Sequence, residues 1–208
     1  MTRSPKREPR RPNDGYMTPR WAIRAVLPKL SLYEGMNILE PCAGDGAVLA
    51  ELQDVGQDPA DLFAVELDAD IAASTQARFP GVKVRCQDAL ALPDTLDGRF
   101  DLVITNPPYK LAWEILHRAF KLVEPGGQVA LLLRLNFLAS QKRAEWMRDN
   151  APDVYVLPRR PSFTGGGTDA TEYAWMVWTV PSSTATPRHA GKIEVLPLSV
   201  CVDPEPVA

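Results

Sequence analysis

Short apolar runs rich in β-branched residues alternate along this chain with segments of helical periodicity. Such alternation is typical of βαβ units, which build a parallel sheet with helices on both faces. No helical segment separates the last two runs, so one strand should be antiparallel. The pattern predicts an α/β fold with a mostly parallel, seven-stranded sheet. The predicted strands are 37–39, 62–66, 82–86, 100–105, 127–133, 154–157 and 172–180, and the predicted helices are 20–30, 47–55, 70–79, 111–122 and 140–150.

The first helix carries its own start and stop signals. Thr18 is suited to the N-cap and Pro19 to the first helical position, while Pro28 should end or bend the helix. In an open α/β sheet the ligand binds beyond the carboxyl ends of the strands. The loops that follow each strand are therefore where the chemistry is expected.

The composition indicates one globular domain that is large enough for a real core. Of the 208 residues, 45% are hydrophobic and 24% are charged. We expect a disordered basic arm at 1–14, a catalytic domain at 15–182, and an extension with a loosely ordered tail at 183–208.

No apolar run approaches the ~20 residues that span a bilayer, and the basic start lacks the apolar centre of a signal peptide. We therefore expect a cytoplasmic protein without membrane contact. Cys42, Cys86 and Cys201 are far apart and form no zinc-binding pattern with the two histidines. We expect free thiols and no metal.

The charge is unevenly distributed along the chain. Residues 1–30 hold eight basic and two acidic residues, a net charge of +6, whereas residues 31–105 carry −10 and residues 106–208 carry +1. The basic arm and the pair Arg159-Arg160 could contact phosphates.

The loop Asn106-Pro107-Pro108-Tyr109 directly follows a predicted buried strand. Two prolines stiffen the loop and delay the next helix. The amide oxygen of Asn106 and the carbonyl of Pro107 can accept hydrogen bonds from an NH2 group, while the Tyr109 ring can stack on a planar base. The same residue types are also common in ordinary turns, so the function of this loop can be interpreted only together with the loops upstream.

Three upstream loops offer complementary groups. Gly44 and Gly46 allow a tight turn just before a helix, where a ligand can approach the backbone closely. Glu66 ends the second strand, about twenty residues after this turn, and is placed to accept from both hydroxyls of a ribose. Asp88 follows the third strand and can accept from the amine of an adenine. Each acid taken alone could equally be a solvated charge at a strand end.

Together these loops resemble the class I S-adenosylmethionine-dependent methyltransferases that modify adenine N6. The matching segments are 39–46, 65–68, 87–89 and 106–109, and residues 17–19 look like the family's N-terminal cofactor motif. The resemblance implies a Rossmann-like fold and S-adenosyl-L-methionine as the cofactor. It implies cofactor binding by Tyr16, Thr18, Glu40, Pro41, Ala43, Gly44, Gly46, Glu66, Leu67, Asp88, Ala89 and Asn106.

The resemblance also implies a role for the catalytic loop, Asn106, Pro107, Pro108 and Tyr109. Asn106 and Pro107 would accept the two amine hydrogens and direct the nitrogen lone pair at the sulfonium methyl, and Tyr109 would stack on the target base, flipped out if the substrate is a duplex. Phe163 is a candidate for the second stacking face, or else a core residue, and Arg159 and Arg160 are candidates for substrate contacts. The glycine-rich loop at 164–168 is a candidate lid.

Two other features bear on this interpretation. A Pro-Cys pair also occurs in cytosine C5 methyltransferases, but Cys42 lies inside the glycine-rich loop, so we do not expect it to be a nucleophile. Trp175 and Trp178 are expected in the core or on a strand face rather than against a base.

Several substrates remain open at this point. The motif order and the basic arm favour adenine N6 in DNA, with low or short sequence specificity because there is no room for a long recognition segment. Short candidates for recognition are the basic arm, residues 159–168 and the region after Leu133. The alternatives are adenine in ribosomal or transfer RNA, glutamine in a protein, and a non-catalytic nucleic-acid binder. The compact size suits a bacterial or phage-encoded protein, and the sequence leaves monomer or homodimer open.

Overall fold

The computed structural model of the chain describes residues 17–163, 170–183 and 190–201. The expected basic arm at 1–14, Tyr16 and the lid at 164–168 lie outside the described residues, as do parts of the extension at 183–208. The predicted domain boundaries therefore stay predictions. Within the described ranges, no helix is long and apolar enough to cross a membrane.

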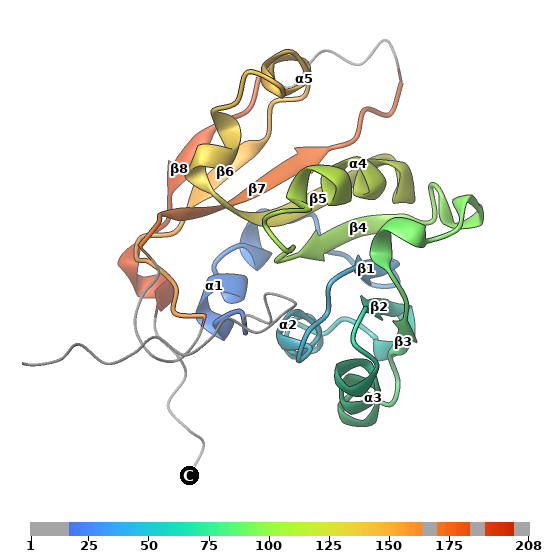
Figure 1. Cartoon of the computed structure of the whole chain (residues 1–208). Coiled ribbons are helices and arrows are strands. Elements are labelled where there is room, and N and C mark those ends of the chain that lie inside the picture. The colour runs from blue at the N-terminus through green and yellow to red at the C-terminus, as the bar shows by residue number, and fades with distance from the viewer. Residues whose placement is uncertain (1–16, 164–169, 184–189, 202–208) are drawn as a thin grey trace, which may run out of the picture.

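The described strands form one sheet in the order β3-β2-β1-β4-β5-β7-β6-β8 (Figure 1). β7 runs antiparallel to both of its neighbours, and every other pair is parallel, which confirms the mostly parallel sheet with one antiparallel strand. The strands are β1 (Ile38–Glu40), β2 (Leu62–Glu66), β3 (Lys83–Cys86), β4 (Phe100–Thr105), β5 (Val123–Arg134), β6 (Asp153–Val156), β7 (Tyr173–Thr179) and β8 (Ile193–Val195).

The expectation of seven strands was wrong, because β8 adds an eighth among the described residues. β8 lies in the segment that the sequence assigned to an extension, and it pairs with β6 at the sheet edge. It is only three residues long, and Ile193 is 75% exposed. Such a strand contains no buried apolar run from which the sequence could predict it. Its backbone pairing with β6 holds it in place.

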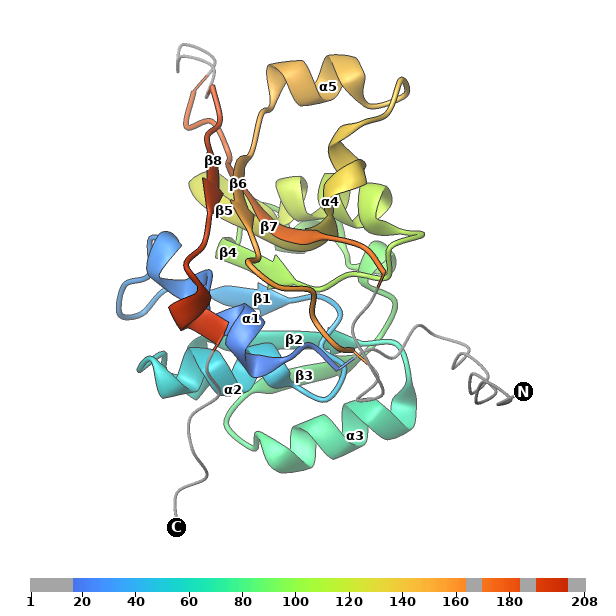
Figure 2. The same ribbon diagram turned by 90° about the vertical axis from the view of Figure 1, so that its left-hand side faces the viewer.

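Helices cover both faces of the sheet (Figures 1 and 2). α1, α2 and α3 lie on one face, where a buried cluster includes Trp21 and Leu49, and α4 and α5 lie on the other, where a second cluster includes Leu116 and Met147. The helices are α1 (Arg20–Arg24), α2 (Ala47–Asp54), α3 (Ala69–Arg78), α4 (Ala112–Leu122) and α5 (Ala144–Asp149).

The start of α1 differs from the prediction by one residue. Pro19, with φ −58° and ψ 130°, occupies the N-cap position as extended backbone, and no side chain caps the helix. Thr18 is therefore not the N-cap, because its hydroxyl is used elsewhere. α1 ends at Arg24, and Pro28 lies in a separate 3-10 turn, Leu27–Lys29.

Two tryptophans of β7 lie in the core, as expected. Trp175 and Trp178 are 0% and 2% exposed, and each indole finds a backbone acceptor. The Trp175 Nε1 donates to the carbonyl of Ala22 at 2.7 Å, and the Trp178 Nε1 to the carbonyl of Asn150 at 2.9 Å. β7 thus holds α1 against the sheet and fixes the segment that precedes α1.

Replacing this anchor should destabilise the fold. Trp175→Phe leaves the Ala22 carbonyl without its buried donor and opens a small void, so we expect the free energy of unfolding to fall by about 2 to 4 kcal/mol. Chemical denaturation measures this loss. The control is Trp113→Phe, since Trp113 is only half-buried; an equal loss in both variants would contradict the anchoring role.

Candidate active site

The loop between β1 and α2 forms a backbone cradle at the carboxyl edge of the sheet. Gly44 and Gly46 have φ values of +51° and +78°, and the Gly46 N–H donates to the Ala43 carbonyl at 2.8 Å. A side chain at Gly46 would run into the ring of Phe79. The local fold therefore requires glycine at Gly46, as the sequence indicated.

Glu66 is fixed beside this cradle. One carboxylate oxygen accepts from the Gly44 N–H at 2.8 Å, and the other accepts from the Asp68 N–H at 2.9 Å. Each carboxylate oxygen can accept a further bond. Next to it, the Leu67 side chain is 60% exposed, so acceptor oxygens and an apolar surface lie together at the end of β2.

Asp88 caps the 3-10 turn Ala89–Ala91 that follows β3. Its Oδ1 accepts from the Leu90 N–H at 2.9 Å, and the residue is exposed. The cap gives the carboxylate a fixed orientation. Since β3 pairs with β2 up to Glu66↔Cys86, Asp88 follows β3 at the same edge as Glu66.

Glu40 is a buried carboxyl group at the end of β1. It is 3% exposed, and its Oε2 has no hydrogen-bond partner among the described residues. Burial raises the pKa of this carboxyl well above its usual range, and the negative charges of Asp45 and Glu66 raise it further. A buried oxygen of this kind is costly unless a donor reaches it, so the site is suited to a ligand that brings one.

Cys42 lies in the same loop, and its thiol is a poor nucleophile. Burial raises the pKa of its thiol to about 12, so the nucleophilic thiolate is scarce at neutral pH. This agrees with the expectation that Cys42 is not a nucleophile. None of the three cysteines forms a disulfide, and the described part of the chain holds no group of three or more metal-ligating side chains.

The amide of Asn106 is held from two sides. Its Nδ2 donates to the Thr18 hydroxyl at 3.0 Å, and its Oδ1 accepts from the Tyr109 hydroxyl at 3.2 Å. Thr18 comes from the segment before α1, which the Trp175 anchor holds in place. The structure thus brings together Thr18, Asn106 and Tyr109, and it shows a use for the Thr18 hydroxyl that the sequence did not indicate.

An aromatic series extends from the catalytic loop into the core. The Tyr109 ring centroid lies 5.6 Å from that of Tyr173, which in turn lies 5.1 Å from Phe163. Phe163 is 6% exposed and belongs to the buried cluster around Trp21. In this structure it is therefore a core side chain, and its role as a second stacking face stays a prediction.

The two arginines predicted to contact substrate have partners within the protein. Arg159 donates to the Cys201 carbonyl at 2.7 Å, with its guanidinium 4.6 Å from the Trp21 ring centroid. Arg160 pairs with Glu172 at 2.5 Å on the surface. Neither lines the cavity beside Tyr109, and a substrate contact by either one stays a prediction.

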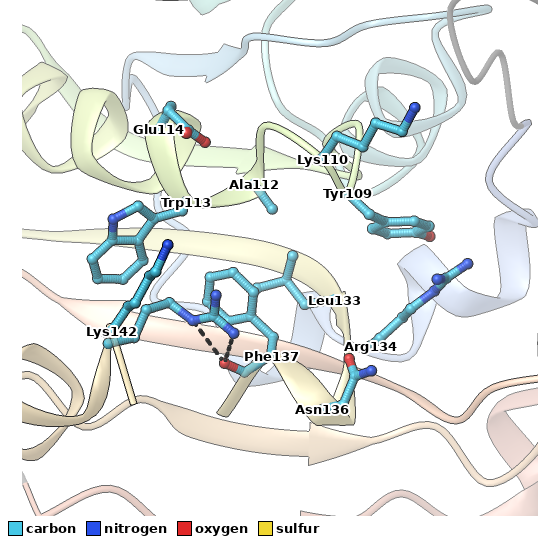
Figure 3. Close-up of a pocket in the computed structure, with 11 residues that line it drawn as sticks. Tyr109, Lys110, Ala112, Trp113, Glu114, Leu133, Arg134, Asn136, Phe137 and Lys142 are labelled. Carbon is cyan, nitrogen blue, oxygen red and sulfur yellow. Dashed lines mark hydrogen bonds between the residues drawn. The ribbon is translucent and has the colours of Figure 1, made fainter. Parts of the chain in front are cut away.

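The sequence indicated Tyr109 and the region after Leu133 as candidates for substrate contacts, but not that they line one cavity. This cavity has a volume of about 390 Å³ and lies between the start of α4 and the segment that follows β5 (Figure 3). The sequence feature that could have predicted this cavity is the presence of basic residues in two loops at the same edge of the sheet. The cavity is lined by Tyr109, Lys110, Ala112, Trp113, Glu114, Leu133, Arg134, Asn136, Phe137, Lys142 and Arg143.

Known proteins share the central part of this chain. Residues 38–127 match a family model described as a methyltransferase domain. A release factor glutamine methyltransferase from Streptomyces coelicolor is 42% identical over 98 residues, which cover 43% of this chain and 31% of that protein. A ribosomal RNA small subunit methyltransferase A from a Synechococcus strain is 33% identical over 120 residues, covering 53% and 43%. The chain thus spans less than half the length of these curated relatives.

Solved structures share the fold over most of the chain. A Listeria monocytogenes protein described as a class I S-adenosylmethionine-dependent methyltransferase superposes with a TM-score of 0.66 at 15% identity, covering 89% of this chain and 68% of that one. The M protein of the type I restriction enzyme EcoKI has a TM-score of 0.63 at 17% identity, covering 83% and 45%. At these identities the likeness shows the fold, which is the Rossmann-like methyltransferase fold.

The matched domain and the fold imply S-adenosyl-L-methionine as the cofactor. The residues at the carboxyl edge fit its chemistry. The cofactor carries hydroxyl and ammonium donors, and Glu66 and the unpartnered Glu40 oxygen are acceptors. Its planar adenine suits the exposed Leu67 surface.

The cradle at Gly46 can be tested by adding one methyl group. Gly46→Ala forces a Cβ into Phe79 at a positive φ, so we expect the loop to shift and affinity for S-adenosylmethionine to fall at least about tenfold. Calorimetry measures the affinity. Gly98→Ala is the matched control, because Gly98 has a φ of +64° with open space around it. An unchanged affinity in Gly46→Ala would remove the cradle from the site.

Proposed function

We propose that this chain, which contains a class I S-adenosylmethionine-dependent methyltransferase domain, methylates the exocyclic N6 amine of adenine in a nucleic acid, with DNA preferred. The observation that carries the proposal is the Asn106 amide, oriented by Thr18 and Tyr109 at the end of β4. β4 pairs directly with β1, whose end leads into the cradle. The amide and the cradle therefore belong to adjacent strands.

The cofactor would be held by the three upstream loops. Glu66 would accept from the ribose hydroxyls and Asp88 from the adenine amine, while the buried Glu40 oxygen would accept from the ammonium group of the methionine part. Leu67 and Ala89 would pack against the adenine ring. When bound, the cofactor supplies an electrophilic methyl group on a sulfonium sulfur.

The catalytic loop would make the substrate nitrogen nucleophilic. The lone pair of an adenine N6 amine is conjugated into the ring, so the amine is a poor nucleophile. Hydrogen bonds to the Asn106 Oδ1 and the Pro107 carbonyl favour a pyramidal nitrogen and direct its lone pair at the methyl carbon. Asn106 and the Pro107 carbonyl would hold the amine in place to receive the methyl group that the cofactor supplies, and the methylated nitrogen would release one proton to solvent.

The choice of polymer rests on charge and motif order. The cluster of Lys110, Arg134, Lys142 and Arg143 beside Tyr109 suits a polyanion better than a protein substrate, which argues against glutamine methylation. The motif order and the basic residues near the N-terminus favour DNA. RNA is the second candidate, supported by the similarity to a protein named for ribosomal RNA.

The decisive experiment offers labelled S-adenosylmethionine with duplex DNA, single-stranded DNA, RNA and protein in parallel, followed by digestion of the products. We expect label on adenine N6, with most in DNA. Label on cytosine or on protein alone would overturn the proposal. Label on adenine in RNA alone would select the second candidate.

The role of Asn106 is tested by Asn106→Ala. This variant removes the acceptor for the amine, so we expect turnover to fall at least about a hundredfold, while cofactor affinity changes little. Asn37→Ala is the control, because Asn37 precedes β1 at the opposite edge of the sheet. Substantial turnover in Asn106→Ala would exclude the assigned mechanism.

Two substitutions of Tyr109 separate its ring from its hydroxyl. Tyr109→Phe keeps the stacking surface and removes the hydroxyl that bonds the Asn106 Oδ1, so the KM for the nucleic acid should stay within about twofold. Tyr109→Ala loses base stacking worth about 1 to 3 kcal/mol, so KM should rise at least about fivefold. Steady-state kinetics distinguish the two, and equal KM values would refute stacking by Tyr109.

A further inference from the structure

The cavity beside Tyr109 carries a concentrated positive charge. Lys110, Arg134, Lys142 and Arg143 line it, and Glu114 is the single acidic residue of the lining, which gives a formal charge of +3. The chain as a whole carries −3. Like charges gathered in one cavity repel one another, so the arrangement favours an anionic occupant.

The four cations divide into two pairs by their contacts. Arg143 donates to the Phe137 carbonyl at 3.1 and 2.8 Å, as the dashed lines in Figure 3 show, and so shapes the segment after β5. The Arg134 Nε donates to the Tyr173 hydroxyl at 3.1 Å, and its guanidinium lies 4.7 Å from the Tyr109 ring centroid. These arginines form part of the wall.

Lys110 and Lys142 differ from the arginines. Both are exposed, and within the described ranges neither makes an ion pair or a hydrogen bond. Lys110 directly follows Tyr109, and Lys142 comes from the opposite wall (Figure 3). Two lysines on opposite sides of one cavity are suited to anionic groups that enter between them, since a Lys ammonium acts as a mobile point charge.

We propose that this cavity holds the backbone phosphates that flank the target nucleotide. Lys110 and Lys142 contact these phosphates, and Arg134 lies between them and the base that stacks on Tyr109. The inference rests on the proposed function and extends it. A volume of about 390 Å³ lies in the usual range for ligand pockets, about 300 to 1,000 Å³. Phosphate contacts position a strand without reading its sequence, so residues 134–143 act as a short, non-specific recognition segment.

The test measures binding of labelled oligonucleotides by fluorescence anisotropy, without methyl transfer. Wild type and the double variant Lys110→Gln/Lys142→Gln are titrated with single-stranded DNA, duplex DNA and RNA of equal length over a range of salt. Losing two phosphate contacts should lower the slope of log affinity against log salt by about 1.4 to 1.8. From about 50 to about 200 mM salt, the wild type should then lose about 7 to 12 times more affinity than the variant.

Matched controls separate this site from general charge effects. Lys121→Gln removes an exposed lysine from the far end of α4, and it should leave the salt slope nearly unchanged. Cofactor affinity and the unfolding midpoint of the double variant should match the wild type. A polyglutamate of equal length should bind at least about tenfold more weakly than the oligonucleotides.

Three outcomes would overturn the inference: an equal slope in wild type and the double variant, an equal reduction in Lys121→Gln, or polyglutamate binding as tight as oligonucleotide binding. A failure of the proposed function is distinguishable, because it would show as oligonucleotide binding with the expected slopes but no label on adenine. At equal salt, the polymer that the wild type binds most tightly identifies whether DNA or RNA is the better source of the phosphates.

Discussion

The parallel pairing of β1 with β2 and β4 is the constraint on which the site depends. Parallel strands end at the same edge, so loops that are far apart in the sequence meet there. The registers Glu40↔Ala64 and Leu39↔Val103 bring the cradle, Glu66 and Asn106 to that edge. The antiparallel strand β7 contributes differently, since its Trp175 holds α1 and thereby the segment that carries Thr18.

The same edge divides into two regions of opposite charge. At the ends of β1 and its neighbours, Asp45 and Glu66 lie near Glu40, whose pKa is raised first by its burial and then by their negative charges. The end of β4 and the segment after β5 gather the cations of the cavity. A cationic cofactor would thus bind in the acidic region and a polyanionic substrate in the basic region. The Asn106 loop lies at the boundary between the two regions.

Much of the fold could be predicted because its signals are local. β2 and β4 have the predicted bounds, since each is an apolar run between turn residues. Contacts between distant segments left no local signal. β8 is ordered by its pairing with β6 rather than by burial, and Arg159, predicted at the substrate, donates to the distant Cys201 carbonyl. The Thr18–Asn106 bond spans 88 residues, and the cavity joins two loops that look ordinary when taken singly.

The contacts of Arg159 bear on the order in which the parts of this site can follow one another along a polypeptide. Its guanidinium touches both Trp21 of α1 and the carbonyl of Cys201, the last described residue. The helix behind Thr18 and the turn Leu198–Cys201 therefore lie side by side (Figure 2). If a linker joined the turn Leu198–Cys201 to the segment before α1 and the chain were opened in the loop before β1, Thr18 would move to the other end of the polypeptide, and its bond to Asn106 would not need to change. The order of the motifs along the gene is thus separable from their order in space, and a circularly permuted chain could build the same site.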